Sequence, residues 1–288
     1  MKTIEKTVEQ EMTLMELIGQ LFPDSSRTSQ KEILAHRVVI QSRRVTQYDY
    51  PLKPGMKVTI EGDENRGKPA RGKMPIVFED RYLMVVNKPS GLLSNSTEER
   101  DITVISEINE YLIKRRSRQR AHIVHRLDRD TSGLLLVAKS KEVARALERD
   151  WKGQVTERIY VGVTWGTPVP RQGTIVSWLK DGEYSVVSSP TDNGGKKAIT
   201  HYKTLKNNRK YALVQFSLET GRRNQIRVHM RENGHPILKD PMYGYDDDRS
   251  PMKRLALHAM RLCFIHPVTG KEMRFDTGIP EEFDLVVS

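Results

Sequence analysis

The spacing of apolar residues predicts a small helical start to the chain. One helical face is formed by Leu14, Leu17, Ile18, Leu21 and Phe22, which recur at intervals of three and four. Thr13 and Glu16 have the spacing of a capping box before that face, and Ser29 and Glu32 repeat the signature before a second short helix. The sequence therefore predicts two short helices within the first 40 residues.

Alternating apolar and polar positions follow at residues 37–46 and 56–61, with a Lys-Pro-Gly turn at 53–55. Two helices followed by a small sheet resemble the S4 RNA-binding domain, so residues 12–61 are expected to form such a domain. The resemblance implies RNA contacts from basic residues of the second helix and first strand, namely Arg27, Lys31, Arg37, Arg43 and Arg44. The segment VVIQSRRV departs from the Val-Asn-Gly turn that is usual in that family.

Residues 62–75 are polar and rich in glycine and charge, as in a linker. Residues 76–288 then show an irregular succession of strand and helix patterns. Strands are predicted within 76–91, at 133–139, 159–166 and 212–221, and helices after Ser140 and over 222–233. Because no regular strand-helix-strand period is present, we expect an α+β catalytic domain with a mixed, mainly antiparallel sheet and flanking helices.

The charge of the chain points to a polyanionic partner. The formal net charge is +11, and nucleic acid is the usual partner of such a protein. Residues 114–129 hold seven Lys or Arg and one acid, and residues 220–231 hold four Arg and no acid. The single cysteine, the polar start and the absence of a long apolar run favour a cytoplasmic protein with no membrane span.

Asp128 lies between Arg126 and Arg129, immediately before the apolar segment LLLVA. Neighbouring positive charge favours the ionised carboxylate, which could then act as a nucleophile or a base. A surface ion pair with either arginine is the alternative. His122, His125 and Asp128 could also suggest a metal site, but no cysteine pair or HExxH motif accompanies them, so no metal is expected.

A second basic group is predicted on the helix at 222–233. Arg223, Arg227 and Arg231 are four residues apart and would form one cationic stripe. A solvated helix face is the alternative, although no acid on that helix lies three or four residues from these arginines to pair with them.

Five ordered motifs resemble those of the RluA family of pseudouridine synthases. They are IVFEDRYLMVVNKPSGLL, HRLDRDTSGLLLVAKS, ERIYVGVTWG, LETGRRNQIRVHM and the closing pair GHPILKDPMYG and LALHAMRLCFIHPVTG. They extend over most of residues 76–280. In that family the aspartate of HRLD is catalytic, which corresponds to Asp128 here.

The resemblance implies that uridine in structured RNA is isomerised to pseudouridine without a cofactor. Its active site would comprise Asp128, Tyr160, which stacks on the base, and Arg227, which orients the aspartate. The third motif usually has histidine where this chain has Asn224, which affects an expected substrate contact rather than catalysis.

Further RNA contacts are implied for basic residues around these motifs. Arg126 would fill the space left by the flipped base, and phosphates would be bound by Arg115, Arg116, Arg118, Arg129 and Arg223. Because members of the resembled family with an S4 domain often modify large-subunit ribosomal RNA, the resemblance favours that RNA over tRNA, and a monomer is expected. A non-catalytic RNA-binding protein and an N-glycoside hydrolase are the rival functions.

Overall fold

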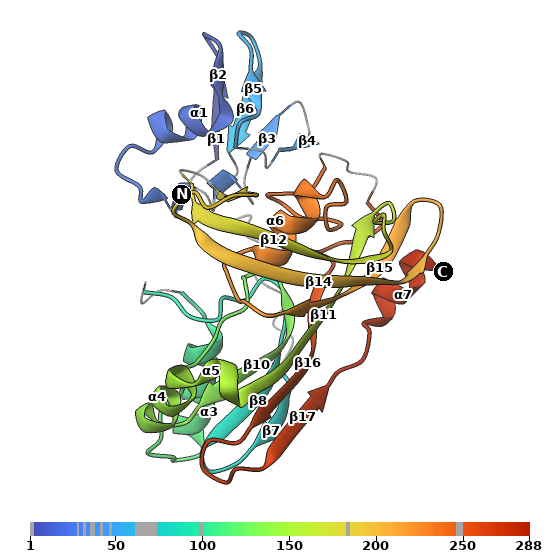
Figure 1. Cartoon of the computed structure of the whole chain (residues 1–288). Helices are drawn as coiled ribbons and strands as arrows, with labels where there is room; N and C mark the ends of the chain where they lie inside the picture. The colour runs from blue at the N-terminus through green and yellow to red at the C-terminus, as the bar shows by residue number, and fades with distance from the viewer. Residues whose placement is uncertain are drawn as a thin grey trace.

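A computed structural model describes residues 3–27, 29–30, 33–34, 38–40, 43–45, 48–60, 74–97, 101–182, 185–245 and 250–288. The ribbon in Figure 1 shows a small N-terminal unit and a larger unit built on one long, strongly curved sheet. No helix within the described ranges is long and apolar enough to cross a membrane.

The N-terminal unit contains a small sheet and a capped helix. Its elements are β1 (Ile4–Thr7), β2 (Met12–Thr13), α1 (Leu14–Leu21), β3 (Val38–Ile40), β4 (Arg43–Arg44), β5 (Pro51–Leu52) and β6 (Lys57–Ile60). The strands pair in the order β1-β6-β3-β4, and β2 pairs with β5. The predicted capping box is confirmed, since the Thr13 side chain accepts from the Glu16 N–H and Glu16 accepts from the Thr13 N–H.

This unit begins earlier than residue 12, the predicted boundary, because β1 pairs antiparallel with β6. Residues 62–73, most of the linker predicted over 62–75, lie outside the described residues, as do Lys31 and Arg37. The assignment of an S4 domain and its RNA contacts therefore stays a prediction.

The larger unit carries 11 strands in one sheet among the described residues. These are β7 (Ile76–Glu79), β8 (Leu83–Lys88), β9 (His122–Ile123), β10 (Ser132–Ala138), β11 (Val155–Trp165), β12 (Gln172–Asp181), β13 (Val186–Ser189), β14 (Lys196–Asn207), β15 (Tyr211–Leu218), β16 (Leu257–Ile265) and β17 (Glu272–Asp276). Its helices are α3 (Val104–Lys114), α4 (Lys141–Arg149), α5 (Trp151–Gln154), α6 (Gln225–Glu232) and α7 (Glu281–Val287).

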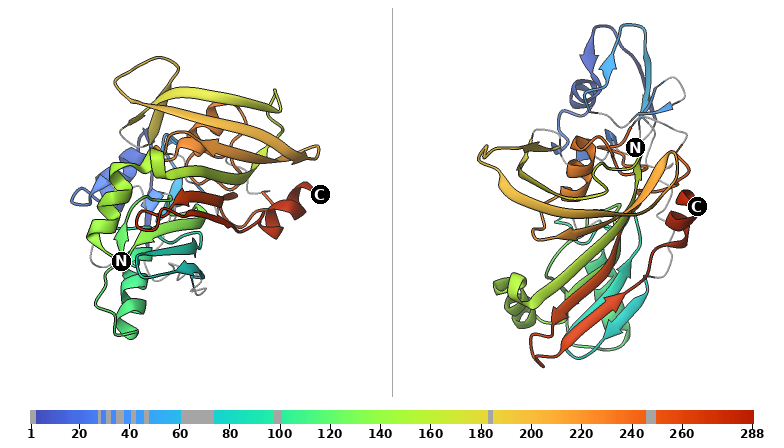
Figure 2. Two further views of the ribbon diagram at one scale, coloured as in Figure 1. Left: turned by 60° about the horizontal axis from the view of Figure 1, so that its bottom comes forward. Right: turned by 45° about the vertical axis from the view of Figure 1, so that its right-hand side comes forward.

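The sheet order is β13-β12-β14-β15-β11-β16-β10-β8-β7, with β17 on β16 and β9 on β10. Every pairing among the described strands is antiparallel except that of β10 with β16. Figure 2 shows the long strands β12 and β14 arching over one end of the sheet. The predicted α+β class with a mainly antiparallel sheet is thus confirmed.

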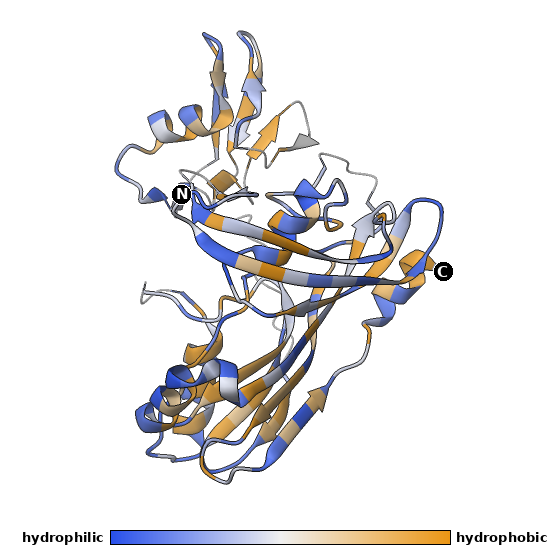
Figure 3. Ribbon diagram, in the orientation of Figure 1, coloured by the Kyte–Doolittle hydropathy of each residue, from blue (hydrophilic) through white to orange (hydrophobic). Residues whose placement is uncertain are grey.

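The centre of the sheet is buried on both faces, which explains the unbroken apolar segment of β10. Leu135 and Val137 pack with α3, whereas Leu134 and Leu136 pack with α4. Side chains alternate between the faces of a strand, so a strand covered on both sides is apolar throughout. Figure 3 shows hydrophobic residues concentrated on these central strands.

Candidate active site

Asp128 lies on the loop that joins β9 to β10, and buried contacts fix this loop. Leu127 is buried in the cluster beneath α3. The Ser94 hydroxyl donates to the Leu127 carbonyl (2.8 Å) and accepts from its N–H (3.1 Å). Leu127 therefore anchors the residue next to the carboxylate.

A buried lysine ties the same loop to the end of β8. The Lys88 ammonium donates to the carbonyls of Pro89, Leu92 and Arg129 at 3.0, 2.8 and 2.8 Å. Burial lowers the pKa of Lys88 to about 7, against the opposing effect of the nearby carboxylates. The Ser90 hydroxyl adds a hydrogen bond to the Asp130 carbonyl (2.7 Å).

The loop enters β10 through a position that requires glycine. Gly133 has φ of +114°, and a Cβ there would lie 2.3 Å from the Ala259 carbonyl oxygen. This close approach accompanies the parallel pairing of Ser132 and Gly133 with His258 and Ala259. The contact between β10 and β16 thus fixes the position of the loop that carries Asp128 at the point where it enters β10.

Arg227 on α6 faces Asp128 but makes its closest contacts with Asp240. The distance from Arg227 Nη1 to Asp128 Oδ2 is 4.0 Å. Arg227 Nε and Nη2 donate to the two oxygens of Asp240, both at 2.7 Å, and Nη1 donates to Asn224 Oδ1 at 2.8 Å. The Asp240 side chain is 0% exposed and also accepts from the Met242 and Tyr243 N–H groups.

These bonds hold the guanidinium in one orientation and in its charged form. Burial alone would lower the pKa of Arg227, but the Asp240 carboxylate raises it above its ordinary value. The ring of Tyr243 lies 5.2 Å from the guanidinium carbon and adds a cation–π contact. Arg227 is therefore a fixed positive charge beside Asp128.

Burial dominates the electrostatics of Asp128. It raises the pKa of the carboxyl above the ordinary 3.8, while Arg227, Arg126 and a hydrogen bond from the Asn224 backbone lower it. The arginines favour the ionised form as predicted, but they do not outweigh burial. The side chain keeps 22% of its surface exposed, so it can still reach a ligand.

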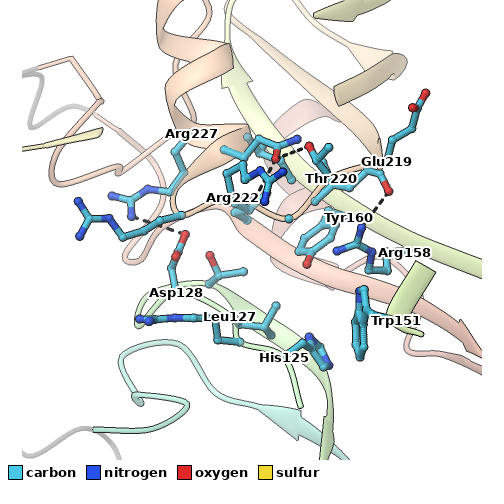
Figure 4. Close-up of a pocket in the computed structure, with 18 of the residues that line it drawn as sticks. His125, Leu127, Asp128, Trp151, Arg158, Tyr160, Glu219, Thr220, Arg222 and Arg227 are labelled. Atoms are coloured by element: carbon cyan, nitrogen blue, oxygen red, sulfur yellow. Dashed lines mark hydrogen bonds and ion pairs between the residues drawn. The ribbon is translucent and has the colours of Figure 1, made fainter. Parts of the chain in front are cut away.

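The residues around Asp128 enclose a cavity of about 450 Å³. Tyr160 on β11 lines it together with Asp128 and Arg227. Figure 4 shows Asp128 and Arg227 pointing toward one another at one end, with the Tyr160 ring between them and Arg158. Burial raises the pKa of the Tyr160 hydroxyl, so the phenol stays protonated at neutral pH.

The predicted stripe of Arg223, Arg227 and Arg231 is wrong. The helix begins at Gln225 because Asn224 has a left-handed φ of +55°. Arg227 is buried against Asp240, Arg223 pairs with Asp181 at 2.7 Å, and Arg231 lies over the Tyr245 ring. The three arginines therefore have different surroundings and do not form one cationic stripe.

Asn224 is itself buried at 8% exposure. Its amide donates to the Tyr243 hydroxyl (3.3 Å), and its carbonyl oxygen accepts from Arg227. Asn224 therefore helps to hold Arg227, the arginine that faces Asp128.

The other predicted RNA contacts occupy two places. Arg126 is exposed and lines the cavity, and Arg129 donates from Nε to the Gly91 carbonyl (3.3 Å). The exposed side chains of Arg115, Arg116 and Arg118 lie beyond the far end of β10, where Gln119 binds the Arg81 carbonyl in the β7–β8 turn. The seven residues of β10 span on the order of 20 Å, so these three arginines are remote from Asp128.

His125, one of the two histidines of the alternative metal site, has other contacts. His125 Nε2 accepts the Leu136 N–H (3.0 Å), and its ring packs against Trp151. Burial lowers the pKa of His125 to about 3, so the ring is neutral. The described part of the chain contains no group of three or more metal-ligating side chains.

Sequence reasoning missed Asp240 and Lys88 as parts of the site. Both lie within the quoted motifs GHPILKDPMYG and VVNKPSG. The available signal was a charged residue close to an apolar segment within each motif, since charges are almost never fully buried unless paired.

The fold of the larger unit resembles that of a solved pseudouridylate synthase domain. The structure of human RNA Pseudouridylate Synthase Domain Containing 1 matches with a TM-score of 0.60 and 25% identity, covering 75% of this chain and 88% of that one. The model of the RNA pseudouridylate synthase family matches residues 82–232, a segment that contains Asp128, Tyr160 and Arg227.

Curated relatives agree over nearly the whole chain. Ribosomal large subunit pseudouridine synthase D of Neisseria meningitidis serogroup B is 34% identical over 282 residues, which cover 92% of this chain and 75% of that one. The protein of the same name from Escherichia coli O157:H7 is 32% identical over 93% of this chain and 87% of that one. The chain belongs to the RNA pseudouridylate synthase family. It is an RNA pseudouridine synthase, an isomerase.

Proposed function

We propose that the enzyme converts one or more uridines of large-subunit ribosomal RNA to pseudouridine. The relatives from Neisseria and Escherichia carry that RNA in their names and align with over nine-tenths of this chain. The observation that supports the chemistry is the pair of Asp128 and Arg227, 4.0 Å apart in a cavity that Tyr160 also lines.

In the proposed reaction Asp128 acts directly on the target nucleotide. The bond between C1′ and N1 breaks, the uracil turns, and C5 bonds to C1′ while its proton is transferred to N1. Asp128 would either attack C1′ or remove the 2′ proton, and both routes need the carboxylate. No net oxidation or group donation occurs, so the reaction as proposed uses no cofactor and no metal.

Arg227 is proposed to keep Asp128 ionised and oriented. Asp240 and Asn224 hold the guanidinium by three hydrogen bonds, so its charge is in place before RNA binds. A charge that is already oriented needs no reorganisation during the reaction.

Tyr160 is proposed to stack on the target uracil and to assist removal of the C5 proton. Its ring lines the same cavity as the carboxylate, and burial keeps its hydroxyl protonated. Enclosure on this side would also retain the detached uracil and exclude water from C1′.

The target base must leave the RNA stack to enter this cavity, at a cost of a few kcal/mol. Arg126 is exposed at the rim and is the proposed wedge that occupies the vacated space. Arg129 and Arg223 are proposed to contact nearby phosphates, and the N-terminal unit to bind more distant RNA through residues including Lys31 and Arg37.

All groups proposed for catalysis come from one chain, so we propose that a cytoplasmic monomer is active. Light scattering during activity measurements would test this. Equal conversion with and without a chelator is expected, and loss of activity with the chelator would contradict the proposal of metal-free chemistry.

The test of the substrate is a pseudouridine map of total RNA from cells with and without the gene. Loss of a signal in large-subunit ribosomal RNA is expected, whereas a loss confined to tRNA would contradict the proposal. Incubation of purified protein with that RNA separates the rivals: free uracil indicates a hydrolase, and unchanged RNA indicates a binding protein.

A further inference from the structure

The end of the catalytic cavity away from Asp128 contains an arginine that the chemistry above does not use. Arg158 precedes Tyr160 by two residues on β11, so both side chains project from the same face of the strand. Both line the cavity, together with Trp151 and Lys152. Figure 4 shows Arg158 beside Tyr160, on the side opposite Asp128.

Arg158 has no acidic partner among the described residues. Its Nη2 donates a hydrogen bond to the neutral Leu218 carbonyl, at 3.3 Å. Glu219, the acid that also lines the cavity, is bonded through its carboxylate to His201 at 2.6 Å. Partial burial without a counter-ion lowers the pKa of Arg158, and a desolvated cation of this kind gains most from an anionic ligand.

An aromatic platform restricts where the guanidinium can lie. Its carbon is 6.0 Å from the centre of the Trp151 ring. The Trp151 ring also packs against His125, with ring centres 4.8 Å apart. His125 is neutral and bonded to the β10 backbone, so the platform is attached to the sheet.

We propose that Arg158 binds a backbone phosphate next to the target nucleotide and thereby positions the uridine between Tyr160 and Asp128. This inference rests on the proposed function for its substrate. The cavity would then have two ends: one for the uracil and its ribose, and one for the phosphate that follows or precedes them. Lys152 and Arg222 add positive charge to the lining of the cavity.

The test compares Arg158→Gln with Arg158→Lys and with a matched control, Arg209→Gln. Arg209 is an exposed arginine in the turn between β14 and β15, outside the cavity. The substrate is the shortest fragment of large-subunit ribosomal RNA that the parent protein converts, assayed in single turnovers over a range of salt. Melting temperatures are measured on the same preparations.

We expect Arg158→Gln to raise the RNA concentration for half-maximal rate about tenfold, the size expected for a charge-assisted hydrogen bond. The maximal rate should change much less. The salt slope should fall by about 0.7, because one phosphate contact is lost. Arg158→Lys should restore part of the affinity, and Arg209→Gln should resemble the parent.

A single neutral methylphosphonate, placed in turn at each linkage flanking the target, locates the contact. At one of these linkages the methylphosphonate should weaken RNA binding by the parent protein. At the same linkage it should cause no further loss of affinity in Arg158→Gln. A parental affinity and salt slope in Arg158→Gln would overturn the proposal, and so would additive losses at every linkage.

A wrong substrate assignment can be distinguished from a wrong assignment of the phosphate contact. If the parent converts no ribosomal RNA, the same variants are compared for binding of an oligouridine, on which the affinity and salt effects of Arg158→Gln are still expected. Equal binding by Arg158→Gln and Arg209→Gln would then refute the phosphate contact.

Discussion

Replacement of Asp240 by asparagine should reveal how the site is held together. In the native protein Asp240 binds Arg227 through two hydrogen bonds of 2.7 Å, with side chains 0% and 6% exposed. Asp240→Asn nearly preserves volume but leaves the buried guanidinium, among the described residues, with Asp128 at 4.0 Å as its remaining ion-pair partner. Breaking one partner of a buried pair typically costs about 3–5 kcal/mol.

A loss of that size is a substantial share of the roughly 5–15 kcal/mol that stabilises most proteins. At about 2–4 °C per kcal/mol for a domain of this size, the melting temperature should fall by roughly 6–20 °C. The matched control is Asp284→Asn, which removes an exposed pair with Lys206 at 3.2 Å and should have a far smaller effect.

The same variant should change the titration of Asp128. The negative charge of Asp240 raises the pKa of Asp128, so its removal should lower that pKa. The acid limb of the rate profile should therefore move to lower pH in Asp240→Asn, measured below its melting temperature. An unchanged melting temperature together with an unchanged acid limb would refute the view that Asp240 holds Arg227.

Further predictions concern individual parts of the site. Tyr160→Phe should stay folded and keep RNA affinity while its single-turnover rate falls; a parental rate would leave stacking as the sole role of Tyr160. Gly133→Ala should melt at lower temperature, because its Cβ would meet the Ala259 carbonyl at 2.3 Å and its φ is +114°; an unchanged melting temperature would contradict this. Protein that starts at Met74 should stay folded and modify short RNA, with weaker affinity and a shallower salt slope; unchanged affinity would remove the RNA-binding role of the N-terminal unit. The parent should lose activity as the pH falls through the raised pKa of Asp128, at a pH above the ordinary carboxyl value of 3.8; an acid limb at or below that value would contradict the role of burial.

Local patterns in the sequence were sufficient for many elements. The capping box of Thr13 and the strands predicted within 76–91 depend on neighbouring residues alone, and the structure contains both. The parallel pairing of β10 with β16 joins residues more than 120 positions apart. The periodicity of neighbouring residues cannot predict this pairing, although Gly133 is the residue at which the two strands approach closely.

The sequence predicts those residues of the candidate site that lie in the motifs typical of the family. Asp128, Tyr160 and Arg227 were named from sequence, and the structure brings all three to one cavity. The spacing of arginines on a helix could not show that Arg227 turns inward, because its partner Asp240 comes from a loop 13 residues away. Nor could composition show that burial outweighs the arginines around Asp128, since desolvation depends on the folded surroundings.

The central claim is that the Asp128 carboxylate performs the chemistry, and Asp128→Asn tests it most directly. The change nearly preserves volume but removes the charge and the nucleophile or base. Melting temperature, affinity for the large-subunit ribosomal RNA fragment and pseudouridine yield are measured on one preparation. A folded variant that binds RNA and forms no detectable pseudouridine is predicted, whereas a folded, RNA-bound variant that still forms pseudouridine would contradict the mechanism.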